Sequence, residues 1–349
     1  MPARRSSRPT IADVAARAGV SKMAVSFALN GRDGVSAETR ARVLRIADEL
    51  GWRPNSAARA LSGDRAGAFG LVLAKRTDEL AADTFYMQLL AGLESALAPS
   101  GTSIAMHIAE SDDAASEVYR SLAAERRVDG FLVTDVLVDD PRLPLLTELR
   151  VPAVLLGESR PGFAAIEGAD ADGVEQILTH VELLGHRRIG RVSGSRRLQY
   201  VVRREAAYAA GAARRGMSIS TAVAEDSFAG AARATAELLD RPVTPTVLVF
   251  DTDLFAVAGL GVVRERGLDV PRDISVVTWD GSILSAVTRP VLTSLRRDVV
   301  ELGRAAARAL LLALEGDAPR AIEDGGSVRE AGVLSLHLTP GGSTAALEN

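Results

Sequence analysis

The sequence has no cysteine among its 349 residues, which excludes disulfides and thiolate metal sites. It also has no apolar run that approaches the ~18 residues needed to cross a bilayer. The basic segment Met1–Arg8 is not followed by an apolar stretch, so we expect no secretory signal. With 47% apolar and 25% charged residues, the composition is that of a globular cytoplasmic protein with two or three domains.

Sequence signatures of common enzymes are missing as well. There is no P-loop, no Rossmann glycine fingerprint after a strand and no nucleophile elbow. His107, His180, His186 and His337 lack the spacing of metal ligands, and His186 precedes an expected strand, which favours a structural role. The turn Ser193–Ser195 has the composition of a phosphate-cradling turn, a pattern too common to define a site. We therefore expect no catalytic residues, no metal and no cofactor.

Positive charge is concentrated near the N-terminus. Residues 1–65 contain twelve Arg and Lys against six Asp and Glu, whereas the whole chain has a net charge of −4, so the remainder carries −10. A basic head on an acidic body predicts that the head binds a polyanion. A basic surface that contacts only solvent is the alternative interpretation of this excess of Arg and Lys.

The head has the pattern of a helix-turn-helix. Thr10-Ile-Ala-Asp13 is a capping box that begins one helix, and Gly19 ends it. Ser21 then caps a second helix, Lys22–Leu29, with Val25, Ala28 and Leu29 expected to face inward. Two short helices joined by so tight a turn are typical of this motif.

The outer faces of the second helix are predicted to carry Lys22 with Ser26, and Met23 with Phe27. Lys22 could reach guanine or phosphate, while Met23 and Phe27 could contact thymine methyl groups. A small three-helix domain that binds protein is the alternative interpretation of this face.

A third helix is expected from Ser36 to Gly51, with Ala41, Val43, Leu44, Ala47 and Leu50 facing inward. Residues 56–62 follow a break at Pro54 and are too short to form a stable helix alone. We expect them to fold only when DNA and a partner chain supply contacts.

These motifs together resemble the headpiece of the LacI/GalR family. The match covers nearly all of residues 9–63, on the stretches Thr10–Ala15, Ala18–Ser21, Leu29-Asn30, Val35-Ser36 and Pro54-Asn55. The resemblance implies that the second helix reads the major groove and that residues 56–62 form a hinge helix whose Leu61 wedges into the minor groove. The implied DNA-binding residues are Thr10, Ser21, Lys22, Met23, Ser26, Phe27, Asn30, Ser36, Thr39, Asn55, Ala58 and Leu61.

The second helix departs from the family pattern at two positions. The family usually has Thr-Val-Ser-Arg where this chain has Ala24-Val25-Ser26-Phe27. We therefore expect an operator that differs from the commonest family half-site at the bases that face Phe27.

Beyond residue 67, short apolar runs alternate with amphipathic stretches, which predicts parallel sheets with helices on both faces, an α/β class. The expected strands are Phe69–Leu73, Ser103–Ile108, Gly130–Val133, Ala153–Leu156, Ile189–Val192, Thr246–Phe250 and Ile274–Thr278. Helices are expected near 84–98, 113–126, 173–184, 203–215, 228–239, 253–266 and 298–315. Ligands in such folds bind beyond the carboxyl ends of the strands.

The body is similar to the effector domain of the same family, itself similar to periplasmic sugar-binding proteins. The matching stretches include Val128–Gly130, Leu184–Ile189, Arg204 with Tyr208, and Trp279-Asp280. The resemblance implies two doubly wound lobes, of about 68–166 and 167–296, with a ligand cleft between them. The candidate effector-binding residues are Phe85, Tyr86, Glu158, Arg204, Thr252, Trp279 and Asp280, with Trp279 expected to stack on a sugar.

The expected domains are a helix-turn-helix headpiece (1–51), a hinge helix and linker (52–67), a two-lobed ligand-binding and dimerisation domain (68–340) and a tail (341–349). We expect a homodimeric repressor of double-stranded operator DNA, with a sugar as the default effector and a purine as the alternative. The motif departures at Ala169, Ala207 and Thr252 leave the effector open. A solute-binding protein or an enzyme of the same body fold remains the alternative function.

Overall fold

The computed structural model describes residues 9–29, 33–52, 65–77, 80, 83–157, 159–315 and 335–347. The chain divides into two compact units, Met1–Ala66 and Gly67–Asn349, and each is described by itself. No helix within these described ranges is long and apolar enough to cross a membrane.

The first unit is a small three-helix domain, the headpiece. Its helices are α1 (Ile11–Ala18), α2 (Lys22–Leu29) and α3 (Ala37–Glu49). They pack around a core of Val14, Ala15, Ala18, Val25, Ala28, Val43, Ile46 and Ala47. The expected inward face of α3 was partly wrong, because Ala41 and Leu44 are exposed and Ile46 lies in the core instead.

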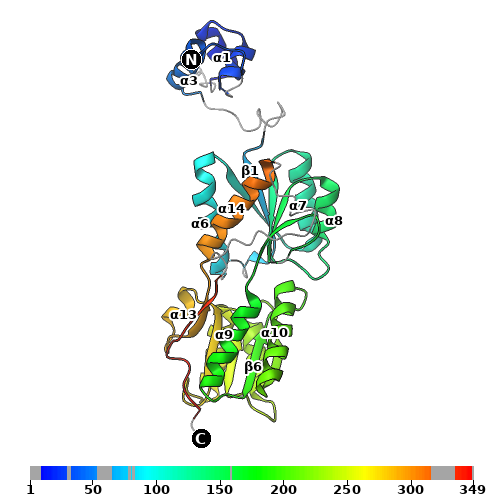
Figure 1. The fold of residues 1–349 in the computed structure, drawn as a ribbon, viewed down its shortest axis with the longest axis vertical. Coiled ribbons are helices and arrows are strands. Elements are labelled where there is room, and N and C mark those ends of the chain that lie inside the picture. Colours follow the sequence, from blue (N-terminus) through cyan, green and yellow to red (C-terminus); the bar gives the residue numbers. More distant parts are fainter. Residues whose placement is uncertain are drawn as a thin grey trace, which may run out of the picture. The chain divides into compact units, whose positions relative to one another are not determined.

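The second unit begins with a lobe built on a five-stranded parallel sheet in the order β2-β1-β3-β4-β5. Its strands are β1 (Ala68–Ala74), β2 (Ser103–Ala109), β3 (Gly130–Val133), β4 (Ala153–Gly157) and β5 (Ala164–Glu167). Its helices are α6 (Thr84–Leu97), η1 (Ala98–Ser100), α7 (Asp112–Ala124), α8 (Arg142–Leu149) and α14 (Val299–Glu315). Helices α6 and α14 cover one face of the sheet, and α7 and α8 cover the other (Figure 1).

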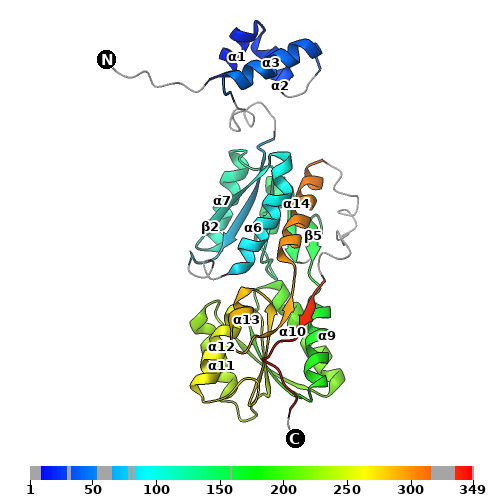
Figure 2. The same ribbon diagram turned by 90° about the vertical axis from the view of Figure 1, so that its left-hand side faces the viewer.

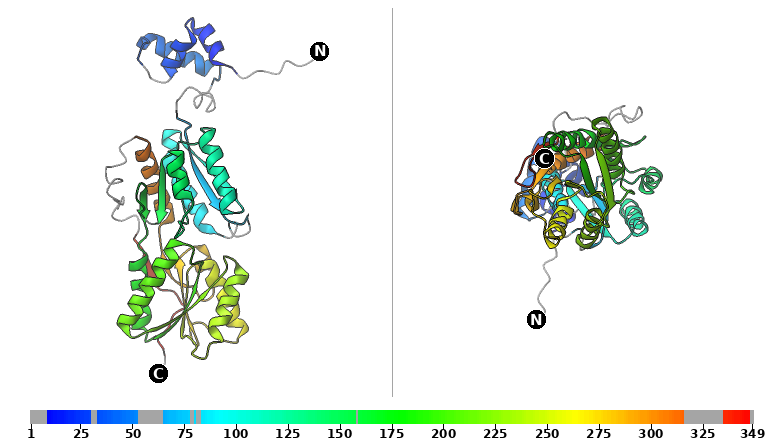
Figure 3. Two further views of the ribbon diagram at one scale, coloured as in Figure 1. Left: turned by 90° about the vertical axis from the view of Figure 1, so that its right-hand side faces the viewer. Right: turned by 90° about the horizontal axis from the view of Figure 1, so that it is seen from below.

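The second lobe has a six-stranded sheet in the order β11-β10-β9-β8-β6-β7, parallel except for the edge strand β11. Its strands are β6 (Arg188–Ser193), β7 (Ser218–Val223), β8 (Val247–Phe250), β9 (Ser275–Asp280), β10 (Thr293–Arg296) and β11 (His337–Thr339). Its helices are α9 (Asp170–Leu183), α10 (Gln199–Arg215), α11 (Phe228–Leu239), α12 (Asp253–Glu265) and α13 (Ile283–Val287). Helices α9 and α10 lie on one face of the sheet, opposite α11 and α12 (Figures 2 and 3).

The lobes exchange elements near the C-terminus. Helix α14 follows β10 of the second lobe but packs in the first, where its Gly303 lies against Gly92 of α6. A Cβ atom on Gly303 would come within 2.3 Å of the Leu89 carbonyl oxygen, and one on Gly92 within 2.0 Å of the Val300 carbonyl oxygen. The two helices can approach this closely only because both positions lack a side chain.

The α/β class and the seven expected strands are confirmed, while β5, β7, β10 and β11 escaped the sequence analysis. Strand β7 lies at an edge and is only partly buried, and β5, β10 and β11 are three or four residues long. Such strands carry too little apolar periodicity to be recognised.

Residues 341–347, which the sequence analysis assigned to a tail, pack on the second lobe. Ser343 is fully buried: its hydroxyl donates to the Val276 carbonyl oxygen (2.6 Å) and accepts from the Thr293 amide (2.8 Å). His186 is 2% exposed and contacts Thr246 (3.0 Å) and Ser275 (3.1 Å), which supports its expected structural role.

Candidate DNA interface and ligand cleft

A hydroxyl side chain caps each headpiece helix. Thr10 and Asp13 form the capping box of α1, the Ser21 hydroxyl accepts from the Ala24 amide (3.1 Å), and the Ser36 hydroxyl accepts from the Thr39 amide (3.2 Å). Amide groups at helix N-termini attract phosphate, so these three helix starts are suited to a DNA backbone.

The hydroxyls differ in what they can still offer to a phosphate, which only accepts hydrogen bonds. The Thr10 hydroxyl already donates to the Asp13 carboxylate (2.7 Å), as does the Thr10 amide (2.7 Å). The Ser36 hydroxyl donates to the Thr39 hydroxyl (2.9 Å), which leaves the hydrogen of Thr39 available. Thr39 is therefore better prepared than Thr10 to donate to a phosphate.

Helix α2 turns Val25 and Ala28 inward and leaves Lys22 and Met23 exposed, with Met23 at 66%. Phe27 is only half-buried, and its ring contacts Gly34 in the turn before α3: a Cβ atom on Gly34 would lie 3.0 Å from the ring. The outward position expected for Phe27 is thus only partly correct, because the ring also anchors the turn between the two helices.

Four predicted DNA-binding residues, Asn30, Asn55, Ala58 and Leu61, lie outside the described residues, as does the expected hinge helix. The same is true of Glu158, the effector candidate that follows β4.

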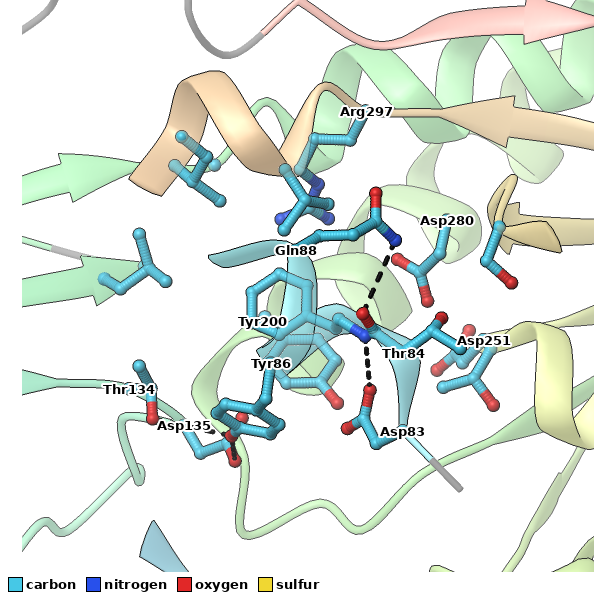
Figure 4. A pocket seen from close by; sticks show the side chains of 18 of the residues that line it. Asp83, Thr84, Tyr86, Gln88, Thr134, Asp135, Tyr200, Asp251, Asp280 and Arg297 are labelled. Carbon is cyan, nitrogen blue, oxygen red and sulfur yellow. Dashed lines mark hydrogen bonds between the residues drawn. The ribbon is translucent and has the colours of Figure 1, made fainter. Parts of the chain in front are cut away.

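The second unit contains a cleft between its two lobes, with an empty volume of about 1280 Å³ that includes its open mouth. Both lobes line it, mainly with residues that follow the carboxyl ends of strands: Lys75 after β1, Asp135 after β3, Asp251 after β8 and Asp280 at the end of β9. The first turns of α6 and α10 add aromatic side chains, among them Tyr86 and Tyr200 (Figure 4).

Five of the predicted effector residues line this cleft: Phe85, Tyr86, Arg204, Thr252 and Asp280. Phe85 and Tyr86 pack edge to face, with ring centroids 5.4 Å apart. The Thr252 hydroxyl accepts from the Phe255 amide (3.2 Å) and so caps α12 at the edge of the cleft. The cleft thus combines aromatic faces with many polar groups, as ligand sites do.

The expectation that Trp279 stacks on a ligand was wrong. Its ring is fully buried in the core of the second lobe and does not line the cleft. The Arg204 guanidinium lies 3.5 Å from the ring centroid, and the indole N–H donates to the Tyr208 hydroxyl (3.4 Å). Trp279 therefore supports Arg204 from behind.

Arg204 is also held by Asp170, the residue that begins α9. Arg204 Nε donates to Asp170 Oδ1 (2.9 Å), and Arg203 donates to Oδ2 (2.5 Å). Burial alone would raise the pKa of Asp170, but Arg204, Arg297 and Arg203 outweigh it and hold the pKa below its usual value. Asp170 thus fixes two arginines in an orientation prepared before any ligand arrives.

Lys75 lies among three carboxylates. Its Nζ is 3.1 Å from Asp226, 3.6 Å from Asp135 and 4.0 Å from Asp83, and its side chain is only 15% exposed. Burial opposes its charge, but the carboxylates and Tyr86 outweigh burial and raise the pKa of Lys75, so it stays protonated. Asp226 belongs to the second lobe, so this ion pair joins the two lobes.

Three acidic groups are poorly compensated. Burial raises the pKa of Asp83 to about 6, and burial with the charge of Asp280 raises that of Asp253 to about 6. Burial also raises the pKa of Asp280, whose backbone has φ +81°, and no hydrogen bond or ion pair from another described residue reaches its carboxylate. The Asp280 carboxylate is therefore available to a ligand, whereas Asp83 pairs with Lys75, and Asp253 accepts from Ser282 and Thr278.

A second set of contacts joins the lobes beside the cleft. Leu137 and Leu198 form an antiparallel bridge, in which the Val138 amide donates to the Arg197 carbonyl oxygen (2.9 Å) and the Gln199 amide to the Val136 carbonyl oxygen (2.9 Å). The Arg197 guanidinium also pairs with Asp112. The lobes are thus in contact beside the cleft.

Sequence reasoning missed Lys75, Asp83, Asp135, Asp226 and Arg297. The residues after β1 and β3 had a signal, since ligands bind beyond the carboxyl ends of strands. Arg297 follows β10, a strand that was not recognised, so no signal existed for it.

A helix-turn-helix unit in one chain with a two-lobed α/β domain and a ligand-sized cleft defines a class: DNA-binding regulators that respond to small molecules. Two family models match the chain: bacterial regulatory proteins of the lacI family over residues 10–55, and a periplasmic binding protein-like domain over residues 178–344.

Relatives of full length support the same assignment. The HTH-type transcriptional regulator CelR of Thermobifida fusca is 32% identical over 90% of this chain and 94% of its own. The HTH-type transcriptional regulator AglR of Rhizobium meliloti is 31% identical over 75% of each chain.

Two solved structures are similar over nearly the whole chain. The lac repressor dimer bound to operator and the anti-inducer ONPF has a TM-score of 0.81 at 25% identity, covering 97% of this chain and 100% of that one. The CelR–cellobiose complex has a TM-score of 0.73 at 29% identity, covering 96% and 100%. The chain belongs to the LacI family of bacterial regulatory proteins and is a DNA-binding transcriptional regulator. The expected cytoplasmic location agrees with this family.

Proposed function

We propose that this chain is a sequence-specific repressor that binds operator DNA as a homodimer, and that a sugar bound between the two lobes sets its operator affinity. The observation that carries the proposal is the cleft between the lobes, which aromatic rings, Arg204 and the open carboxylate of Asp280 line. The mechanism is linkage: the sugar binds one arrangement of the lobes better, and that arrangement differs in how well the paired headpieces bind DNA.

For DNA, we assign Lys22, Met23 and Ser26 to base edges in the major groove and Ser21 and Thr39 to phosphates. Lys22 and Met23 are exposed on the same helix, and the caps of α2 and α3 offer hydroxyl and amide donors. The hinge role of residues 56–62 is part of this proposal and rests on the family resemblance.

For the effector, we assign hydrogen bonds to Arg204, Thr252 and Asp280 and apolar contacts to Phe85 and Tyr86. Arginine and carboxylate groups of fixed orientation suit the hydroxyls of a sugar, and aromatic faces suit its C–H groups. That CelR was solved with cellobiose supports a sugar for this chain as well.

For the homodimer, we assign an apolar strip, defined as Met87 of α6, Met106 and Ile108 of β2, and Ile283 of α13, which line one surface pocket together. These side chains are 41–70% exposed, and β2 is the edge strand of its sheet. An exposed apolar strip along an open sheet edge is suited to cover by a second copy. Because both lobes contribute to the strip, a change in lobe arrangement would alter the dimer contact.

We assign no catalytic activity to the cleft, because the family consists of regulators. Despite its many carboxylates, no group of three or more His, Asp or Glu in the described part of the chain could hold a metal ion. Turnover of a bound sugar would overturn this part of the proposal and favour an enzyme of the same fold.

The test is selection of binding sites from random DNA with the full-length protein, followed by footprinting with a panel of neutral sugars. We expect a near-palindromic site whose protection changes with at least one sugar. Lys22→Ala should weaken the site preference, whereas Arg45→Ala, which removes the same charge from a residue paired with Glu49 (3.0 Å), should retain it. A protein with no preferred duplex, with or without sugars, would overturn the proposal.

A further inference from the structure

The charges that line the cleft are unequal. Seven aspartates line it, namely Asp83, Asp135, Asp170, Asp226, Asp251, Asp253 and Asp280, against four cations, namely Lys75, Arg203, Arg204 and Arg297. A fifth cation, Arg191, lies behind the lining and pairs with both oxygens of Asp251 (3.0 and 2.6 Å). Even with Arg191 counted, carboxylates exceed cations by two.

The excess lies at the end of the cleft near Lys75. There the Lys75 ammonium group pairs with three carboxylates, since an oxygen of each lies within 4.0 Å of Lys75 Nζ: Asp83, Asp135 and Asp226. The Asp135 carboxylate also accepts from the Tyr86 hydroxyl (2.5 Å), which uses one more donor without adding positive charge. An anionic ligand would meet net negative charge at this end.

At the other end the charges balance without a spare cation. Arg203 and Arg204 are both held by Asp170. The charge of Arg297 acts on Asp280, and that of Asp280 acts on Asp253. Figure 4 shows Arg297 and Asp280 at this end. Arg297 Nε is buried and has no hydrogen-bond partner among the described residues, so it offers one donor to a ligand. Its charge, however, is opposed by two nearby carboxylates.

Carboxylates accept hydrogen bonds and cannot donate them. The cleft therefore offers mostly acceptors, together with the apolar faces of Phe85, Tyr86 and Tyr200. A hydroxyl group can donate to these acceptors, whereas a phosphate or a carboxylate adds acceptors and negative charge to a site that already has both in excess.

We infer that the cleft selects an uncharged, polyhydroxylated sugar and rejects phosphorylated and acidic forms of the same sugar. This inference rests on the proposed function and narrows it: the effector is a neutral sugar, not a sugar phosphate, a uronate or an aldonate. Discrimination comes from the surplus carboxylates at the Lys75 end and from Asp280.

Isothermal titration calorimetry of the full-length protein tests this with matched pairs: glucose and glucose 6-phosphate, maltose and maltose 6-phosphate, cellobiose and cellobionate. We expect the neutral member of at least one pair to bind at least about 100-fold more tightly than its anionic partner. The residual binding of the anionic member should strengthen with added salt, which screens repulsion, while that of the neutral member should change little.

Two variants locate the source of the discrimination. Asp226→Asn should improve binding of the anionic sugar and so reduce the affinity ratio between the neutral and the anionic sugar at least tenfold. Asp139 is an exposed aspartate outside the cleft, and Asp139→Asn should leave this ratio unchanged. An anionic sugar that binds the wild-type protein as tightly as its neutral partner would overturn this inference while leaving a sugar effector in place. If no sugar of either charge binds, both this inference and the sugar effector of the proposed function are overturned.

Discussion

The Arg204 guanidinium lies over the Trp279 ring, with its Cζ atom 3.5 Å from the ring centroid, and it lines the ligand cleft while the ring is buried in the core. Trp279 and Asp280 are the last two residues of β9, and the backbone leaves regular strand geometry at Asp280, which has φ +81°. Asp280 faces the cleft and Trp279 enters the core. Arg204 therefore has two fixed contacts: its guanidinium packs on the Trp279 ring, and its Nε donates to Asp170.

This arrangement predicts the fluorescence of Trp279. Since the chain contains only Trp52 and Trp279, the variant Trp52→Phe isolates the emission of the buried ring. We expect a blue-shifted emission that iodide quenches poorly, with no further protection when a sugar is bound. Iodide quenching that is strong without sugar and lost with it would place the Trp279 ring in the ligand site.

Asp170 should be essential to the stability of the second lobe. Asp170→Asn removes the counter-charge of Arg203 and Arg204, of which Arg204 is almost fully buried. Leaving a buried charge unpaired typically costs about 3–5 kcal/mol, and we expect a loss of about 3 kcal/mol in the free energy of unfolding, measured with urea.

The control for this variant is Asp172→Asn, an exposed aspartate in the same helix, which should change the free energy of unfolding by less than about 0.5 kcal/mol. Similar losses in the two variants would mean that Asp170 acts through the first turn of α9 and not through the arginines.

The helices of the headpiece and most helices and strands of the body could be predicted from the sequence, because apolar periodicity and helix caps are local signals. Caps such as Thr10, Ser21 and Ser36 act on amides within three residues of themselves, so their effect is readable from the sequence. The cleft residues that follow strands could also be predicted from the sequence. The rule that ligands bind beyond the carboxyl ends of strands located Asp280, and it applies equally to Lys75 and Asp135.

The remaining features depend on contacts between distant segments. Asp170 meets Arg204 only because α9 and α10 pack side by side, and Lys75 meets Asp226 only because two lobes face each other. Whether Trp279 lined the cleft or the core depended on which face of β9 lies under α9 and α10. No spacing in the sequence carries that information.

The contact between Phe27 and Gly34 predicts how the headpiece responds to a small change in the turn before α3. Gly34 has φ +114°, and an alanine there would place its Cβ 3.0 Å from the Phe27 ring. We expect Gly34→Ala to destabilise the headpiece by about 2 kcal/mol, measured by hydrogen exchange of the α2 and α3 amides, and to weaken operator binding.

Gly19→Ala separates backbone strain from the contact with Phe27. Gly19 has φ +65° with no atom within 4 Å of a Cβ placed there, so this variant should cost only about 1 kcal/mol. Equal effects of the two alanines would indicate that the Phe27 ring moves aside freely and does not anchor the turn.

Asp253 should give the free energy of unfolding a measurable pH dependence. Its carboxylate accepts from the Ser282 amide (2.5 Å) and the Thr278 hydroxyl (2.9 Å), yet burial and the nearby Asp280 raise its pKa from an ordinary value of 3.8 to about 6. Because the folded pKa is the higher one, the stabilisation from Asp253 is complete below about pH 4 and is lost as the pH rises through 6.

Asp253→Asn removes this titration while keeping the shape of the side chain, and the titration of groups that do not interact with Asp253 cancels in the comparison. Relative to the variant, the wild-type protein should be more stable at pH 5 than at pH 7.5 by about 1 kcal/mol, measured by urea unfolding at both pH values. The exposed Asp172→Asn variant should show no such difference from wild type. A wild-type advantage that instead grew toward pH 7.5 would mean that Ser282 and Thr278 stabilise the Asp253 carboxylate more than burial and Asp280 destabilise it.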